Sequence, residues 1–349
     1  MRDVAFAVPG DLDTPTGGYR YDRAVIAGLR ALGHKVRVVP LGPGFPFPSD
    51  TELADAATLL AEVPVDTVLI VDGLAFSVLP EPVLEAIEAP LVALVHHPLA
   101  WETGLDDAAV ARFTASETAA LAHAPQVVVT SPHTARSLAR SFGVALERIT
   151  VALPGLAPRW AGLGRAPVSP PRIVSVGSIS PRKGVDVFIA ALGLIADLDW
   201  HCDIIGGIDR EGPLAAALLE AIDGAGLGGR VDLLGARSEE EIGAAFEAAS
   251  VFALATRYEG FGMVFAEAMA AGLPIVGTTA GAVPDVVPPE AGRLVPPDDP
   301  AAFAAALRAL LTDATLRSSL ATAARQAGAR FGGWEETSAL ISEVVEVAR

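Results

Sequence analysis

Two glutamates lie eight residues apart in the stretch Glu259-Gly260-Phe261-Gly262-Met263-Val264-Phe265-Ala266-Glu267. The apolar run 251–255 before it predicts a buried strand, and the residues after the glycines predict a helix that ends at Gly272, two residues before Pro274. The stretch therefore predicts a strand, a loop and the start of a helix. Glycine allows a backbone to approach a ligand closely, and the N–H groups of a helix start favour anionic or hydroxyl-rich partners.

Glu267 is the only ionisable residue on a predicted helix of Met, Val, Phe and Ala. Burying a carboxylate without a partner costs on the order of several kcal/mol. Glu267 therefore needs a partner, and the residue alone leaves two open: a structural arginine or a pair of ligand hydroxyls.

The quoted stretch resembles the E-x7-E signature of the retaining glycosyltransferases of family 4, which have the GT-B fold. The similarity runs from about Thr14 to Trp334. The resemblance implies that Glu259 faces the donor sugar, that Glu267 holds the ribose hydroxyls, and that the backbone between them contributes to donor binding. The backbone positions so implied are Gly260, Phe261, Gly262, Met263 and Val264.

A second motif follows the strand 174–176, where Gly177 opens a loop that carries Arg182 and Lys183 before a helix over 185–194. The chain holds only two lysines against 23 arginines, so Lys183 is an unusual residue here. The bland interpretation is a solvated basic pair, but cations at a helix start oppose the helix dipole. An ammonium beside a guanidinium neutralises a departing diphosphate without a metal. The resemblance likewise implies donor contacts from Gly177, Arg182 and Lys183.

Two other nucleotide-binding motifs are missing. The stretch from Gly177 to Lys183 lacks the Gly-Lys-Ser/Thr ending of a Walker loop. No Gly-x-Gly-x-x-Gly follows the first predicted strand, which argues against a nicotinamide dehydrogenase.

Near the N-terminus, Gly17-Gly18 precedes a predicted helix over 19–32. Two glycine amides at a helix start suit a phosphate, although a tight turn explains the pair equally well. The resemblance implies that Gly17 and Gly18 approach the donor phosphate and the acceptor.

The apolar run 91–95 predicts a strand that ends in His96-His97. Ligands of open α/β sheets bind outside the carboxyl ends of the strands, although a histidine there is often only a hydrogen-bonding residue. The resemblance implies a histidine close to the reacting sugar. Alignment on Pro98 favours His96, with His97 as the alternative, and His133 is a further candidate of lower rank.

The resemblance also assigns Gly207 to the diphosphate region and Arg237 to the loop that reads the base. The chain departs from the family pattern at two places. Asp285 occupies a position that is usually Glu, and 153–155 lacks the usual Asn before its Gly.

At 349 residues the chain exceeds one ordinary core, and strand and helix patterns alternate throughout. Pro and Gly cluster from 153 to 171, which predicts a linker. We expect an α/β protein with an acceptor-side domain over 1–160 and a nucleotide-sugar domain over 168–332. The resemblance implies two Rossmann-like domains that face each other across a cleft, with the helix 333–349 packed back on the first.

The formal charge of −17 and the lack of a basic stripe argue against a nucleic-acid partner. The candidate membrane-facing stretches 48–63 and 101–122 are acidic, so anionic lipid would repel them and a soluble acceptor is favoured. We expect no signal peptide or anchor. The single cysteine, Cys202, predicts a core thiol and a reducing compartment, most simply the cytoplasm.

The resemblance implies a hexosyltransferase that retains anomeric configuration and takes a UDP- or GDP-type donor. Because Arg182 and Lys183 can neutralise the diphosphate, we expect it to be metal-independent, with no cofactor. We expect Arg182, Lys183, Glu259 and His96 to be its catalytic residues. No second carboxylate can be placed opposite the sugar, which favours a front-face route over double displacement. Two alternatives stay open: a GT-B epimerase or phosphorylase-like enzyme, and a non-catalytic sugar-nucleotide-binding subunit.

Overall fold

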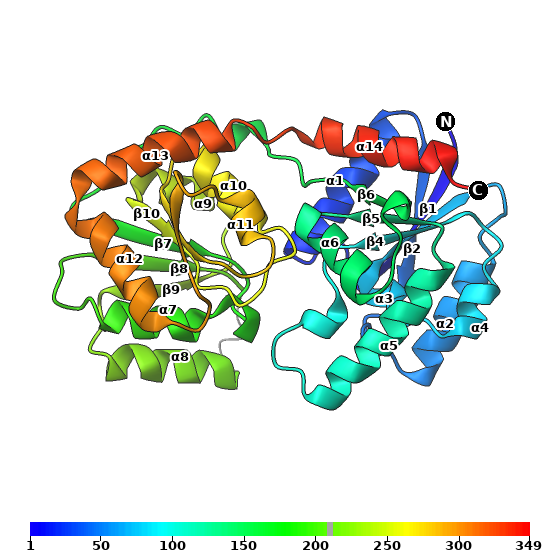
Figure 1. The fold of residues 1–349 in the computed structure, drawn as a ribbon, viewed down its shortest axis with the longest axis horizontal. Helices are drawn as coiled ribbons and strands as arrows, with labels where there is room; N and C mark the ends of the chain where they lie inside the picture. Colours follow the sequence, from blue (N-terminus) through cyan, green and yellow to red (C-terminus); the bar gives the residue numbers. More distant parts are fainter. Residues whose placement is uncertain (208–211) are drawn as a thin grey trace. The chain divides into compact units, whose positions relative to one another are not determined.

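The computed structural model describes residues 1–207 and 212–349. The chain divides into unit 1, which comprises Met1–Gly155 and Gly332–Arg349, and unit 2, Leu156–Phe331. Each unit is built on one parallel sheet of six strands with helices packed against it (Figure 1). The predicted α/β class is confirmed.

Unit 1 has the strand order β2-β1-β3-β4-β5-β6. Its strands are β1 Asp3–Pro9, β2 Lys35–Leu41, β3 Val68–Asp72, β4 Leu91–Val95, β5 Gln126–Val129 and β6 Ile149–Val151. Its helices are α1 Gly17–Ala31, α2 Asp50–Ala61, α3 Gly73–Phe76, α4 Glu81–Glu85, α5 Asp107–His123, α6 Pro132–Ser141 and α14 Trp334–Val347, with 3₁₀ turns η1 Leu99–Trp101 and η2 Leu146–Arg148.

Alternation along β1 shows how both faces of this sheet are buried. Val4, Phe6 and Val8 belong to one core cluster, and Ala5 and Ala7 belong to the other. Successive side chains of a strand point to opposite faces, so a strand covered on both sides is apolar throughout.

Helix α14 packs on α1 within unit 1 (Figure 1). Ile341 and Val344 share a core cluster with Val25 of α1. A methyl group on Gly28 would overlap the Ser338 side chain, so glycine lets these two helices approach closely.

Unit 2 has the strand order β12-β11-β10-β7-β8-β9. Its strands are β7 Arg172–Val176, β8 His201–Ile205, β9 Val231–Gly235, β10 Val251–Ala253, β11 Ile275–Thr278 and β12 Gly292–Val295. Its helices are α7 Val185–Gly193, α8 Pro213–Gly224, α9 Glu239–Ala248, α10 Met263–Ala270, α11 Val283–Val286, α12 Pro300–Thr312 and α13 Ala314–Gly328, with 3₁₀ turns η3 Pro158–Trp160 and η4 Pro181–Lys183.

The first predicted domain boundary, at residue 160, lies inside unit 2, which begins at Leu156. The physical reason is Trp160, which is 2% exposed and packs against Phe246 with ring centroids 5.6 Å apart. Gly155 ends the first segment of unit 1 against the backbone of Trp334, where a side chain would not fit.

Candidate functional site

A buried ion pair in unit 2 joins the two sequence motifs. Lys183 Nζ donates to Glu259 Oε1 at 2.6 Å, and Arg182 Nη1 lies 3.6 Å from Glu259 Oε2. Lys183 is 9% exposed and Glu259 is 5% exposed. Three of the predicted catalytic residues therefore meet, although 76 positions separate Lys183 from Glu259 in the chain.

The charge state of Glu259 follows from its neighbours. Burial raises the pKa of this carboxyl, but the charges of Lys183 and Arg182 outweigh it and hold the pKa below its ordinary value. Glu259 is therefore a carboxylate at neutral pH. A buried pair of this kind adds little net stability, and its main effect is to fix the position of the ammonium group.

Backbone contacts hold the two motifs in register. The carbonyl of Arg182 accepts the N–H of Arg257 at 2.7 Å and the hydroxyl of Thr256 at 3.1 Å. Gly184, with φ of 62°, ends η4 and precedes α7, and a methyl group there would overlap the carbonyl of Ala255. The turn that carries Lys183 is thus fastened to the loop that carries Glu259.

The side chain of Arg257 also connects the two motifs. It donates to Asp186 in two bonds of 3.0 and 2.6 Å and to Asp298 at 2.7 Å, and it also reaches the carbonyl of Pro181. Sequence reasoning missed Arg257. Its signal was an arginine two positions before Glu259, with Asp186 three positions after Lys183.

The predicted donor glycines lie where neighbouring strands end. Gly177 follows β7 and donates to the carbonyl of Ile205, and Ile179 donates to the carbonyl of Gly207, both at 2.9 Å. A Cβ on Gly177 would lie 3.4 Å from Lys183 Cε, whereas one on Gly207 would meet no atom within 4 Å. Gly177 therefore borders the charge pair.

The start of α10 has the predicted loop-to-helix form. Gly262 caps it with φ of 86°, and α10 then begins at Met263 and Val264. The carbonyl of Glu259 accepts the N–H of Ala282 at 2.8 Å. A methyl group on Gly281 would overlap that carbonyl, so the backbone at Glu259 is tightly enclosed.

The other motif residues occupy distinct places. Phe261 is 6% exposed and its ring packs 6.0 Å from that of Phe331, next to the buried Gly260. Glu267 is 4% exposed within α10, as its sequence neighbours predict. Arg237 lies on the surface after β9, where it contacts Glu241 at 3.6 Å and donates to the carbonyl of Ala236. These contacts of Arg237 are local.

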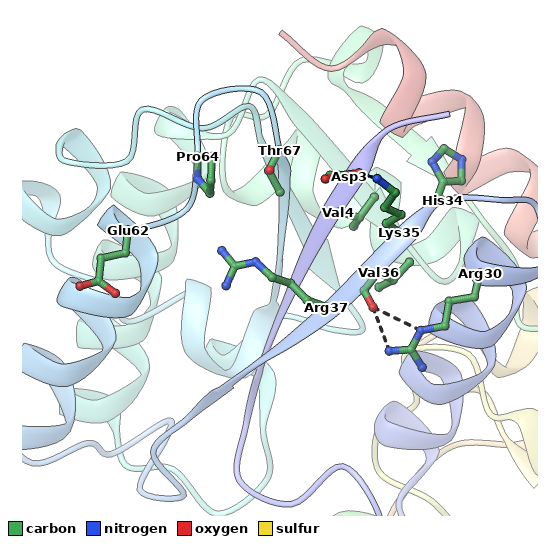
Figure 2. Close-up of a pocket in the computed structure, with 10 residues that line it drawn as sticks. All are labelled: Asp3, Val4, Arg30, His34, Lys35, Val36, Arg37, Glu62, Pro64 and Thr67. Atoms are coloured by element: carbon green, nitrogen blue, oxygen red, sulfur yellow. Dashed lines mark hydrogen bonds and ion pairs between the residues drawn. The ribbon is translucent and has the colours of Figure 1, made fainter.

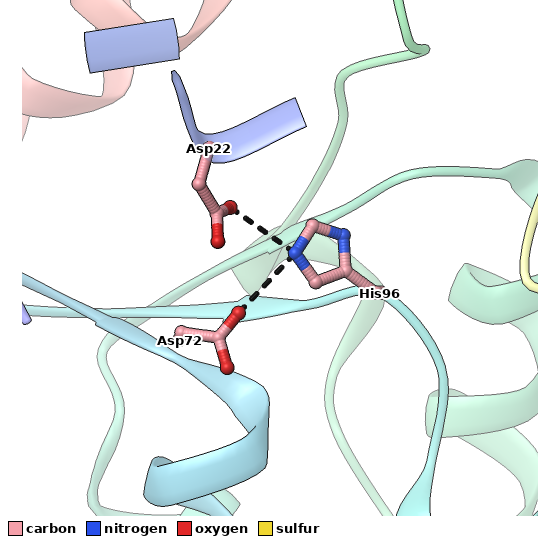
Figure 3. Close-up of side chains that lie close together, drawn as sticks. All are labelled: Asp22, Asp72 and His96. Atoms are coloured by element: carbon pink, nitrogen blue, oxygen red, sulfur yellow. Dashed lines mark hydrogen bonds and ion pairs between the residues drawn. The ribbon is translucent and has the colours of Figure 1, made fainter. Parts of the chain in front are cut away.

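In unit 1, His96 meets two buried acids that sequence reasoning missed (Figure 3). His96 Nε2 lies 3.1 Å from Asp22 Oδ1 and 3.3 Å from Asp72 Oδ2. Asp72 ends β3, and its other oxygen accepts the N–H of Leu74. Asp22 occupies a core-facing position of α1, and the two acids are 0% and 1% exposed.

Charges in this cluster alter its protonation. Burial lowers the pKa of His96, but the two carboxylates outweigh it and raise the pKa to about 10. Burial, together with Asp72, raises the pKa of Asp22 despite its contact with His96. The three ligand atoms lie within 4.8 Å of one another, a spacing that a cation also tolerates.

The other candidates of unit 1 lie nearby or pair elsewhere. Gly17 and Gly18 are the first residues of α1, which begins earlier than predicted because Thr16 caps it and accepts the N–H of Tyr19. A Cβ on Gly18 would lie 3.4 Å from the His96 ring. His97 Nε2 pairs with Glu102 at 3.2 Å.

A surface hollow of about 680 Å³ lies at the opposite end of this sheet (Figure 2). Its lining includes the strand starts Asp3 and Lys35 together with Thr67, which precedes β3. His96 instead follows the carboxyl end of β4, and Asp72 is the last residue of β3. The hollow is therefore separate from the acid–imidazole cluster.

Across residues 1–207 and 212–349, every helix is too short or too polar to span a bilayer. Cys202 is buried in β8, and its burial raises the pKa of the thiol.

The known proteins that this chain resembles are glycosyltransferases. Residues 170–313 match the family described as glycosyl transferases group 1. The D-inositol 3-phosphate glycosyltransferase of Xylanimonas cellulosilytica is 33% identical over 235 residues, which are 62% of this chain and 56% of that protein. The MMP alpha-(1->4)-mannosyltransferase of Mycolicibacterium hassiacum is 29% identical over 274 residues, or 74% and 66% of the two chains. The chain thus spans little more than half the length of the first of these relatives.

Solved structures share the fold along nearly the whole chain. Sucrose-phosphate synthase from Thermosynechococcus elongatus superposes with a TM-score of 0.81 at 20% identity, covering 99% of this chain and 98% of that one. Anabaena HepE, solved in complex with UDP-glucose, gives 0.78 at 17% identity and covers 99% and 100%. The predicted GT-B fold class is confirmed.

Proposed function

We propose that this protein transfers a hexosyl group from a nucleoside diphosphate sugar to an acceptor. Its residues 170–313 match the family described as glycosyl transferases group 1. The observation that carries the proposal is the buried Lys183–Glu259 pair, with Nζ and Oε1 2.6 Å apart. Lys183 and Arg182 would neutralise the diphosphate as it leaves, because fixed cations act most strongly where negative charge develops. Gly177 and Gly207 would let the backbone approach the same group.

The donor sugar would lie against the start of α10. There the N–H groups of Met263 and Val264 belong to the first turn of the helix, which suits oxygen-rich ligands. Glu259 would bind a sugar hydroxyl while holding Lys183 in place. Glu267 would hold the ribose hydroxyls.

We propose a front-face reaction with retained configuration. The bond between the anomeric carbon and the diphosphate breaks, a bond to the acceptor oxygen forms on the same face, and the acceptor proton passes to a diphosphate oxygen. Lys183 and Arg182 would supply the positive charge that a metal ion gives elsewhere, so we expect activity to survive EDTA. His96 is proposed to donate a hydrogen bond to a substrate oxygen.

The acceptor is proposed to be soluble and the enzyme cytoplasmic. The acidic stretches 48–63 and 101–122 support this, because anionic lipid would repel them. The name of the first relative, a D-inositol 3-phosphate glycosyltransferase, is consistent with a small polar acceptor.

Release of nucleoside diphosphate from a panel of UDP- and GDP-hexoses, with and without candidate acceptors, tests this function. We expect acceptor-stimulated release and a product of the same anomeric configuration by NMR. Donor binding without release would instead support a non-catalytic subunit, and turnover to an isomeric sugar nucleotide would support the epimerase alternative. Loss of activity with EDTA, restored by Mg²⁺, would contradict the metal-free mechanism.

A further inference from the structure

Two carboxylates converge on a single ring nitrogen in unit 1 (Figure 3). Asp22 Oδ1 and Asp72 Oδ2 lie 3.1 and 3.3 Å from His96 Nε2. An ionised carboxylate can only accept hydrogen bonds. When the two acids are ionised, a proton on Nε2 gives both of them a donor.

The second nitrogen of the same ring has a different environment. Figure 3 shows Nδ1 on the side of the ring that faces away from both acids. Within residues 1–207 and 212–349, no side chain or carbonyl accepts a hydrogen bond from Nδ1. The side chain is 18% exposed, so part of the ring reaches the surface.

The groups around the ring favour positive charge on it. Asp22 and Asp72 are acidic neighbours of the ring, and among residues 1–207 and 212–349 Asp22 Oδ2 is buried with no hydrogen-bond partner. Tyr21 contacts the ring edge-on at 5.3 Å, and Thr130 donates to the His96 carbonyl at 3.1 Å. The hydroxyl of Tyr21 donates to a backbone carbonyl, which leaves it neutral.

We propose that Asp22 and Asp72 are positioning residues that keep His96 doubly protonated during turnover, so that Nδ1–H is a fixed, charged hydrogen-bond donor to a substrate oxygen. His96 then gives and takes no proton in the reaction. The contact with substrate rests on the proposed function, whereas the protonation state does not.

Histidine ring NMR measures the protonation state directly. The chain has six histidines, so selective ¹⁵N labelling gives a small set of ring signals, and His96→Gln identifies the one that disappears. We expect both His96 nitrogens to stay protonated from pH 6 to beyond pH 8. An ordinary imidazole, with a pKa of about 6.5, loses one of these protons in that range. Titration of His96 near that ordinary value would overturn the proposal.

Asp22→Asn and Asp72→Asn remove one charge each at nearly constant size. Each should lower the His96 pKa, by about 1 to 3 when the lost partner dominates. Glu102→Gln is the matched control, because Glu102 pairs with the adjacent His97 and should leave the His96 signal unchanged. If neither Asn variant moves the His96 pKa, the acids do not hold the proton and the proposal fails. The NMR titration of the unmodified protein measures the protonation state of His96 without any variant. The proposal can therefore be tested even if a variant folds poorly.

Activity and cation binding complete the experiment. With the donor found by the release assay, the Asn variants should lose turnover as pH rises through their lowered His96 pKa, while the unmodified enzyme should not. Mn²⁺ or Zn²⁺ that saturates at one ion per chain and displaces the Nε2 proton would overturn the proposal in favour of a cation site. An inactive protein whose His96 stays protonated would refute the proposed function and leave the assignment of Asp22 and Asp72 intact.

Discussion

Asp186 binds Arg257 through two hydrogen bonds of 3.0 and 2.6 Å, in the fork-to-fork geometry that a guanidinium and a carboxylate favour. Burial raises the Asp186 pKa, but the bonds and charge of Arg257 outweigh this and lower it. Asp186 lies in the first turn of α7, three positions after Lys183, and Arg257 lies two positions before Glu259. This pair therefore connects the two motifs of the proposed donor site.

Arg257→Ala should therefore lower turnover about tenfold, since misplacing a charged group at a reacting centre is costly. The turnover of Arg257→Lys should fall between that of the unmodified enzyme and that of Arg257→Ala, because lysine keeps the charge and loses the paired geometry. Arg308→Ala is the matched control: Arg308 makes the same paired contact with Asp197, at 2.8 and 2.6 Å. Equal kcat values for Arg257→Ala and Arg308→Ala would contradict a positioning role.

Lys183→Ala should reduce kcat by a factor on the order of 100, with a smaller loss of donor affinity, because its charge matters most as the diphosphate departs. Lys35→Ala provides the control, since Lys35 is the other lysine and its side chain is 86% exposed. Steady-state kinetics measures kcat, and donor titration measures the donor affinity. Unchanged turnover in Lys183→Ala would remove this residue from the site.

Glu267→Ala should weaken donor binding by about 2 kcal/mol if the carboxylate holds ribose hydroxyls, the usual scale for hydrogen bonds to a charged group. Calorimetric titration with the nucleoside diphosphate checks this, with the exposed Glu240→Ala on α9 as control. A variant that loses stability and keeps its donor affinity would instead support a structural partner for Glu267.

The stability that Glu259 contributes should depend on pH in one direction. Its folded-state pKa is lower than the ordinary 4.5, so its contribution is fully present above that pH and is lost as pH falls through the folded value. Denaturant unfolding of the unmodified protein and of Glu259→Gln should therefore give a free-energy difference that shrinks as pH falls below the ordinary value of 4.5. A difference that stays constant over this range would show that the pair with Lys183 does not perturb the carboxyl.

Sequence patterns predicted the strands and the glycine turns around the two motifs, because those depend on short-range periodicity and local chemistry. The roles of the motif residues stay predictions. The contact between Lys183 and Glu259 could not be derived in that way, since it depends on how β7 and β10 pair. Arg257 was missed for the same reason, because both of its acid partners lie on other segments.

Asp22 was within reach of the sequence. It precedes Val25, Ile26 and Leu29 at spacings of three, four and seven, so it occupies the apolar stripe of a helix. An acid in such a stripe predicts a buried partner. Asp72 gave no such signal, because an aspartate after an apolar run is also the ordinary cap of a following helix, a role that it has here toward Leu74.

Unit 2 is one continuous segment, whereas unit 1 needs both Met1–Gly155 and Gly332–Arg349. During synthesis the apolar side of α1 therefore has no cover from α14 until residues 334–347 have been made, after all of unit 2. Domains generally fold as units as the chain emerges, which exposes an incomplete domain to aggregation in the meantime. Of the two units, unit 1 is thus begun before unit 2 and completed after it.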